Sequence, residues 1–139
     1  MIMRPNTGDW EDSPVGEKNG KTGRIVILDD HAVFRQALAI MLEYRAGFEV
    51  YADVASPEEA KTALEGLDGG LDLAVVDLDL PGGGAEEFIR ELGERMSGVT
   101  VLGLTANRDS VAGMRGTSQV LTTGTRVDEI LAAARQLVG

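Results

Sequence analysis

The sequence lacks cysteine and is poor in aromatic residues, which make up 4% of its 139 residues. Without cysteine it can form neither a disulfide scaffold nor a thiolate metal site, and it has no cysteine nucleophile. This composition suits the reducing cytoplasm. Hydrophobic residues still account for 43% of the chain, so one core can be buried, built mainly from Val, Leu, Ile and Ala.

Long apolar runs are absent as well. No stretch approaches the roughly 18 residues needed to cross a bilayer, and the first twenty residues lack the apolar core of a signal peptide. The formal net charge of −10 disfavours nonspecific attraction to nucleic acid. We therefore expect a cytoplasmic protein in which this chain itself binds neither a membrane nor nucleic acid.

The chain divides into a polar leader and one domain. Residues 1–23 show no apolar period and are predicted to be a flexible N-terminal leader. Within 24–139, short apolar runs alternate with amphipathic stretches. The runs predict strands at 25–28, 48–52, 71–76, 99–104 and 119–122. The amphipathic stretches predict helices from 33 to just before Gly47, over 56–66, 86–95 and 127–138, with a short, weak one near 109–115.

Strands that alternate with helices predict right-handed crossovers and a parallel sheet covered on both faces. Five such units in about 115 residues leave room only for a three-layer α/β sandwich. In an open parallel sheet, chemistry gathers beyond the carboxyl ends of the strands. The residues that follow each predicted strand are therefore the candidates for a functional site.

Polar residues follow three of these strands: Asp29 and Asp30 the first, Asp77 the third and Thr105 the fourth. If the strands are neighbours, three carboxylates and a hydroxyl converge on one pocket. Clustered carboxylates repel unless a cation or proton neutralises them, and oxygen ligands suit Mg²⁺. A carboxylate beside that ion can attack phosphorus and form an aspartyl phosphate, to which Thr105 could donate a hydrogen bond.

Each of these aspartates alone is as easily explained as a turn residue or helix cap; their combination at three strand ends favours a site. His31 is expected to be a surface residue of the first helical turn rather than a ligand or a base. Asp79 is expected to offer an ion its backbone carbonyl rather than its carboxylate.

Three segments carry a family resemblance: residues 27–35 (ILDDHAVFR), 75–82 (VVDLDLPG) and 102–106 (LGLTA). They resemble the response regulator receiver domain of the CheY-like superfamily, closest to the type that precedes a helix-turn-helix output domain. The resemblance covers residues 24 to 138. It implies a flavodoxin-like fold with strand order 2-1-3-4-5.

The resemblance also implies a function. Mg²⁺ would be bound by Asp30, Asp77 and the Asp79 carbonyl, with Asp29 close by. Asp77 would take a phosphoryl group from a histidine kinase or phosphotransfer protein, Thr105 would contact it, and an output domain or partner outside this chain would respond. The chain would not be an enzyme, beyond self-catalysed phosphotransfer to Asp77 and autodephosphorylation.

Several positions depart from the family pattern. The lysine that follows the fifth strand is replaced by Thr123, and the chain has no lysine after Lys61. Val120 stands where the family has an aromatic residue on the fifth strand, and Gly84-Ala85 replace the usual Asp-Gly. The interval from Thr105 to Thr123 is about one helical turn short, so we expect an abbreviated fourth helix.

Two alternatives follow from these observations. The departures favour a pseudo-receiver, a protein-interaction module that no longer uses phosphate. The Asp77-Leu78-Asp79 sequence also looks like the nucleophile motif of haloacid-dehalogenase-type phosphatases. In those enzymes the motif normally lies on the first core strand and a lysine completes the site, whereas here two βα units precede it.

Overall fold

A five-stranded parallel sheet in the order β2-β1-β3-β4-β5 organises residues 22–139, the part of the chain that the computed structural model describes. The strands are β1 (Arg24–Leu28), β2 (Glu49–Val54), β3 (Leu73–Asp77), β4 (Thr100–Thr105) and β5 (Gln119–Thr122). The helices are α2 (Ala32–Ala46), α3 (Pro57–Glu65), α4 (Gly84–Arg95) and α5 (Val127–Val138). The predicted flavodoxin-like sandwich and its strand order are confirmed. Most of the predicted leader lies outside the described residues.

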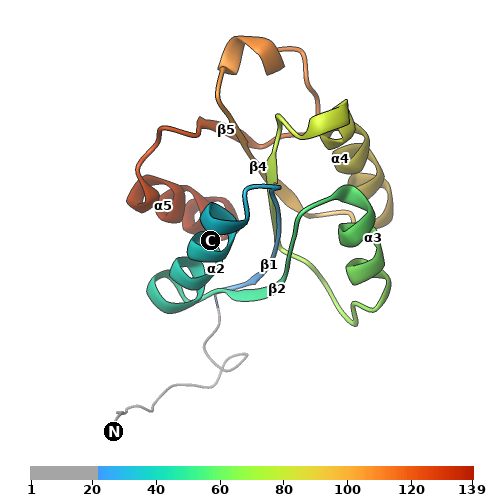
Figure 1. The fold of residues 1–139 in the computed structure, drawn as a ribbon. Helices are drawn as coiled ribbons and strands as arrows, with labels where there is room; N and C mark the ends of the chain where they lie inside the picture. Colours follow the sequence, from blue (N-terminus) through green and yellow to red (C-terminus); the bar gives the residue numbers. More distant parts are fainter. Residues whose placement is uncertain (1–21) are drawn as a thin grey trace, which may run out of the picture.

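The sheet separates two hydrophobic cores (Figure 1). On one face, α2 and α5 cover alternate residues of the central strands, among them Ile25, Ile27 and Val75. On the other face, α3 and α4 cover the intervening residues, among them Val26 and Val76. Because β1 and β3 are buried on both faces, they read in the sequence as continuous apolar runs.

The predicted strands and helices agree with the structure except at their ends and in one segment. The third strand begins at Leu73 rather than at residue 71, and Asp77 and Thr105 are the last residues of their strands rather than the residues after them. The weak helix predicted near 109–115 is only a 3₁₀ turn, η3 (Arg108–Val111). None of the helices between residues 22 and 139 has the length and apolar character that a membrane crossing requires.

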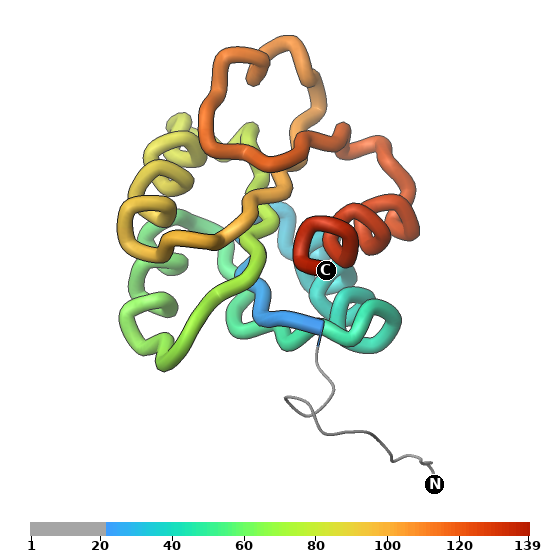
Figure 2. The backbone as a smooth tube through the Cα atoms, turned by 180° about the vertical axis from the view of Figure 1, so that it is seen from behind, coloured from blue at the N-terminus to red at the C-terminus, as the bar shows by residue number. Residues whose placement is uncertain are grey.

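The chain between β4 and β5 rises beyond the end of the sheet instead of covering its face (Figures 1 and 2). It returns through Gly116, whose φ of +93° favours glycine and where an added Cβ would lie 2.7 Å from Ile89 Cγ2 of α4. A pocket of about 610 Å³ lies between α4, the start of β4 and residues 115–116. The helix expected between β4 and β5 (the fourth of the family fold, not α4) is therefore abbreviated, as predicted. Its shortness leaves this side of the sheet partly open.

Candidate functional site

The first acidic segment follows β1 and is fixed by an arginine. The Asp29 amide donates to the Val54 carbonyl at 3.0 Å, and the residue is buried, with 4% of its surface exposed. Arg35 on α2 donates from Nη1 to the Asp29 carbonyl at 2.8 Å and from Nε to Asp53 Oδ1 at 3.0 Å. These bonds tie the ends of β1 and β2 together and hold the exposed Asp30 beside Asp29.

Asp77 ends β3 and is almost completely buried, with 3% of its surface exposed. Its Oδ1 accepts the amide hydrogen of Asp79 at 2.9 Å. Its Oδ2 is buried and has no hydrogen-bond partner among the described residues. Burial, with the nearby charges of Asp29 and Asp30, raises the pKa of Asp77 to about 6. An unpaired buried carboxylate oxygen is costly unless it binds a proton or a cation.

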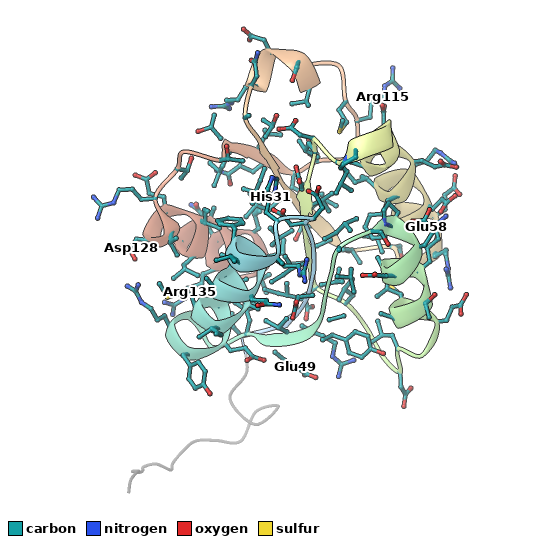
Figure 3. The ribbon with its side chains drawn as sticks, in the orientation of Figure 1. His31, Glu49, Glu58, Arg115, Asp128 and Arg135 are labelled. Carbon is teal, nitrogen blue, oxygen red and sulfur yellow. The ribbon has the colours of Figure 1, made fainter. Side chains whose placement is uncertain are left out.

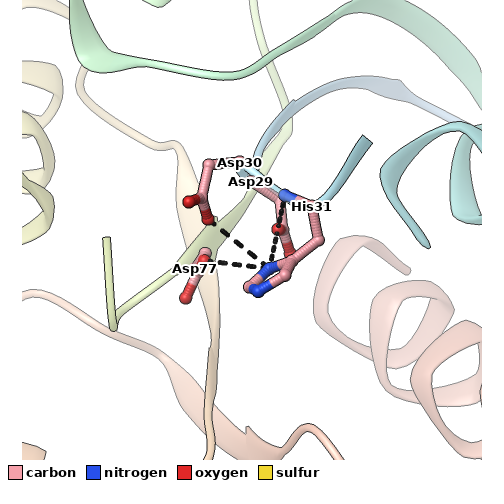
Figure 4. Close-up of side chains that lie close together, drawn as sticks. All are labelled: Asp29, Asp30, His31 and Asp77. Atoms are coloured by element: carbon pink, nitrogen blue, oxygen red, sulfur yellow. Dashed lines mark hydrogen bonds and ion pairs between the residues drawn. The ribbon is translucent and has the colours of Figure 1, made fainter. Parts of the chain in front are cut away.

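His31 lies near the carboxyl end of the sheet (Figure 3) and faces these carboxylates (Figure 4). Its ring Nδ1 lies 2.8 Å from Asp29 Oδ1, 3.4 Å from Asp30 Oδ1 and 3.6 Å from Asp77 Oδ2. The hydrogen bond to Asp29 and the charges of Asp29 and Asp30 raise the pKa of His31. The side chain is 70% exposed, as expected of a surface residue. Its Nδ1 nevertheless faces the three carboxylates.

Thr105 and Asp79 form a second hydrogen-bonded group at the same edge of the sheet. The Thr105 hydroxyl donates to Asp79 Oδ1 at 2.8 Å, and the Ala106 amide donates to Asp79 Oδ2 at 2.7 Å. The sequence favoured the backbone carbonyl of Asp79 over its carboxylate as the functional group. The hydrogen bonds of the carboxylate were not predicted, because nothing in residues 77–79 shows which donors lie across the sheet edge.

These residues surround one pocket of about 480 Å³. It is lined by acidic, apolar and small residues from α2 and from the segments at the ends of β1, β3, β4 and β5: Asp29, Asp30, His31, Phe34, Asp77, Asp79, Pro81, Ala106 and Thr123. Thr105 contributes behind this lining, through its bond to Asp79. The four aspartates predicted from the sequence therefore lie together. Thr123 lies where the family resemblance places a lysine, and its amide donates to the Thr105 carbonyl at 2.8 Å.

The donor set fits a hard divalent cation. Asp29, Asp30, His31 and Asp77 each offer one ligand atom, and these atoms lie within 4.8 Å of one another. The three carboxylates supply oxygen, which Mg²⁺ prefers, and Asp77 Oδ2 is free to bind it. Among the described residues that line the pocket, none is a lysine or an arginine. The pocket therefore favours a cation, and an anion would meet four carboxylates.

Comparisons with known proteins agree with this arrangement. Residues 25–133 match the sequence model of the response regulator receiver domain. The transcriptional regulatory protein DegU of Brevibacillus brevis is 34% identical over 86 residues, which is 62% of this chain and 36% of that protein. This chain thus matches about a third of the length of that relative.

Solved structures give the same result. A two-component response regulator of the LuxR family from Aurantimonas sp. SI85-9A1 is 27% identical with a TM-score of 0.72, over 85% of this chain and 86% of that one. A DNA-binding response regulator of the LuxR family from Staphylococcus aureus has a TM-score of 0.71 over 84% of this chain and 99% of that one. The second is only 16% identical, so it supports the fold alone.

Proposed function

The chain belongs to the response regulator receiver domain family, and on that basis we propose that it accepts a phosphoryl group on Asp77. The observation that carries this proposal is the Asp77 carboxylate, buried at the end of β3 beside an acidic pocket, whose Oδ2 has no hydrogen-bond partner among the described residues. Asp29, Asp30, Asp77 and the Asp79 backbone carbonyl would hold Mg²⁺. Bound there, Mg²⁺ would neutralise charge on the phosphoryl oxygens.

The reaction is a transfer between two proteins. A carboxylate oxygen of Asp77 forms a bond to phosphorus, while the bond from phosphorus to the donor's histidine nitrogen breaks and the imidazole keeps the electron pair. The donor is a histidine kinase or phosphotransfer protein. The chain is not an enzyme acting on a separate substrate, and its own chemistry extends to self-catalysed phosphotransfer and autodephosphorylation. The name of the DegU relative suggests transcriptional regulation as the output, through a domain or partner outside this chain.

Thr123 sets a limit on this function. A lysine at that position would give the phosphoryl group a charge-assisted hydrogen bond, worth about 1.5–3 kcal/mol. Thr123 has no charge, and Lys61 pairs instead with Glu91 at 2.9 Å, on α3 and α4. We therefore expect slower phosphotransfer to Asp77 than in a receiver with the lysine.

The test uses NMR titration with Mg²⁺, with and without beryllofluoride, together with intact-mass measurement after treatment with acetyl phosphate. We expect Mg²⁺-dependent shifts centred on Asp77 and its neighbours, and a gain of one phosphoryl mass that Asp77→Asn abolishes. An absence of any Mg²⁺-dependent change at Asp77, or a mass gain that survives Asp77→Asn, would refute the proposal.

A pseudo-receiver is the second candidate, favoured by Thr123 and by the 3₁₀ turn that stands where a fourth helix is expected. In that case the surface would engage its partner without phosphate. An Asp77→Asn variant that keeps full partner binding and output would support it. The phosphatase hypothesis loses its basis, because residues 25–133 match the receiver family and Asp77 lies on the third strand of the chain.

A further inference from the structure

We propose that the Asp79 carboxylate is a built-in competitor of the phosphoryl group: it holds the two hydrogen-bond donors at the end of β4 that an incoming anion needs. The inference rests on the proposed function of Asp77. It adds that phosphorylation requires the Asp79 side chain to leave Thr105 and Ala106, so that Asp79 sets the affinity of the pocket for anions.

The contact is a two-point clamp. Asp79 Oδ1 accepts from the Thr105 hydroxyl at 2.8 Å, and Oδ2 accepts from the Ala106 amide at 2.7 Å. The hydroxyl has one hydrogen, and its other acceptor, the Asn107 carbonyl, is further away at 3.2 Å. Hydrogen bonds to a carboxylate are about twice as strong as neutral ones. Both donors are therefore committed to Asp79.

The backbone on both sides of Asp79 is held in place. The Asp79 amide donates to Asp77 Oδ1, and the Leu78 amide donates to the Leu104 carbonyl at 2.8 Å. The Leu78 side chain lies directly on Gly103 of β4, where an added Cβ would come within 2.6 Å of Leu78 Cδ1. The loop thus presents Asp79 to the end of β4.

The side chain itself can leave without unfolding anything. Asp79 is an exposed residue, whereas its neighbours Leu78 and Leu80 are buried. Rotation of the Asp79 side chain into solvent would free both donors and leave the backbone bonds of the loop intact. The contact of Asp79 with Thr105 and Ala106 therefore blocks anion binding reversibly.

The rest of the pocket offers an anion little else. Among the described residues that line it, His31 is the single group able to carry positive charge, and its nitrogen already contacts Asp29. Thr123 contributes no charge. Apart from the uncharged Thr123 hydroxyl, the Thr105 hydroxyl and the Ala106 amide are the donors that the end of β4 presents at this pocket, so competition for them should affect anion binding.

The experiment measures the affinity of the full chain for beryllofluoride in saturating Mg²⁺, and the initial rate of Asp77 phosphorylation by acetyl phosphate. Asp79→Ala frees both donors and should tighten binding by about 10- to 100-fold, the range that a net gain of one charge-assisted bond gives. Asp79→Asn keeps one acceptor oxygen without the charge and should give an intermediate increase.

Asp109→Asn is the matched control. It removes one negative charge beyond the same end of the sheet, and between residues 22 and 139 the Asp109 carboxylate makes no hydrogen bond or ion pair. It should change the affinity by less than about twofold, because an exposed charge is screened by solvent and salt. Equal gains in Asp109→Asn and Asp79→Ala would show a general charge effect and overturn the proposal.

A second measurement examines the clamp directly. In the wild-type protein, NMR should detect scalar coupling through the hydrogen bond from the Ala106 amide nitrogen to the Asp79 carboxyl carbon, and beryllofluoride should abolish it. Coupling that persists in the beryllofluoride complex would overturn the proposal even if Asp79→Ala proved poorly folded.

The outcomes separate this inference from the proposed function. Wild-type binding that Asp79→Ala leaves unchanged would overturn the role of Asp79 and leave Asp77 as the acceptor. Binding by Asp79→Ala but not by the wild type would support the competitor role most strongly. Failure of the wild type and both Asp79 variants to bind would overturn both.

Discussion

Asp77 combines burial with ionisation, and the two oppose each other. The residue is held at the end of a strand whose five residues are all buried, and its pKa is raised to about 6, mainly by that burial. An acid with a raised pKa keeps its proton in the folded protein at pH values where the unfolded chain has lost it, at about 3.9. Its ionisation therefore destabilises the fold, and the loss develops as the pH rises from about 4 through about 6.

Replacing Asp77 by Asn should remove this cost. In the absence of divalent metal at pH 7.5, we expect Asp77→Asn to raise the free energy of unfolding by up to about 3 kcal/mol, the equivalent of roughly two pKa units. At pH 4 the gain should fall below about 1 kcal/mol, because the wild-type carboxyl is then protonated in the folded state. Urea unfolding at both pH values measures the difference.

The free energy of unfolding also falls with rising pH because of His31. Its raised pKa stabilises the fold below about pH 6.5, and this contribution is lost as the pH rises through the pKa of His31 in the folded protein. Comparing each variant with wild type at one pH isolates Asp77. Asp109→Asn again serves as the charge-matched control and should show no pH-dependent gain. An equal gain for Asp77→Asn at pH 4 and pH 7.5 would contradict the assigned cause.

Two glycines should respond oppositely to the same substitution. Gly103→Ala pushes Leu78 out of contact with β4 and should destabilise the protein by about 1–3 kcal/mol, as overpacking does. Gly93 lies exposed within α4, with nothing near the position of an added Cβ. Gly93→Ala should therefore stabilise the protein by up to about 1 kcal/mol. Chemical denaturation measures both, and a Gly103→Ala protein as stable as wild type would contradict the role given to Leu78.

At the scale of single residues, the sequence located the pocket but did not predict its contacts. Asp29, Asp30 and Asp77 were found because each ends or follows an apolar run, and strand ends meet at one edge. The clamp of Asp79 on Thr105 and the inward turn of His31 depend on side-chain rotation and on loops far apart in sequence. Patterns along the chain do not contain that information.

At the scale of elements, α3 shows what local sequence determines well. Ser56 caps the helix by accepting the Glu59 amide at 3.2 Å, and Pro57 occupies the first helical position. A serine followed by proline and two glutamates is a local pattern that predicts such a helix start. The Glu59 carboxylate turns back as a capping box requires, but it accepts the amide of Ala55 at 2.9 Å, one residue before the cap. The helix start was predictable because all the interacting groups lie within five residues.

Removing this cap should weaken the protein by a modest and measurable amount. Ser56→Ala leaves the Glu59 amide without its acceptor and should lower the free energy of unfolding by about 1 kcal/mol. Ser56→Asp supplies another capping acceptor and should retain most of the stability. Thermal and urea unfolding of the two variants provide the test, and equal losses in both would mean that the cap is not the cause.

The segment between β4 and β5 was the least well predicted from local sequence. Gly113 and Gly116 weaken a helix, and the structure retains only the four residues of η3. The position of the returning chain depends on the close approach of Gly116 to Ile89. That contact joins residues far apart in the sequence, so the amphipathic pattern indicated a short helix but not the path around it.

At the scale of the whole molecule, the five strands differ in how far they are buried. β1 and β3 are central and buried, whereas β2 and β5 form the two edges. β2 contacts α2 and α3, while β5 mainly contacts β4 and η3, and all four of its residues are half-buried. The edge formed by β5 is therefore the weaker of the two.

Hydrogen exchange should rank the strands accordingly. We expect the amides of β1 and β3 to exchange most slowly, those of β2 faster, and those of β5 and residues 106–118 fastest, because local opening there exposes little buried surface. Exchange followed by NMR or mass spectrometry gives the order directly. β5 amides as protected as those of β3 would contradict this distribution.

The strand order also gives the acidic pocket a bearing on how the chain folds. Asp29 and Asp77 are distant in sequence and meet only when β1 pairs with β3. Their mutual repulsion therefore marks one event on the folding pathway. If that pairing is already formed in the transition state, neutralising Asp77 accelerates folding; if it forms later, the same change only slows unfolding. The folding and unfolding rate constants of Asp77→Asn would thus show whether β1 pairs with β3 before or after the transition state.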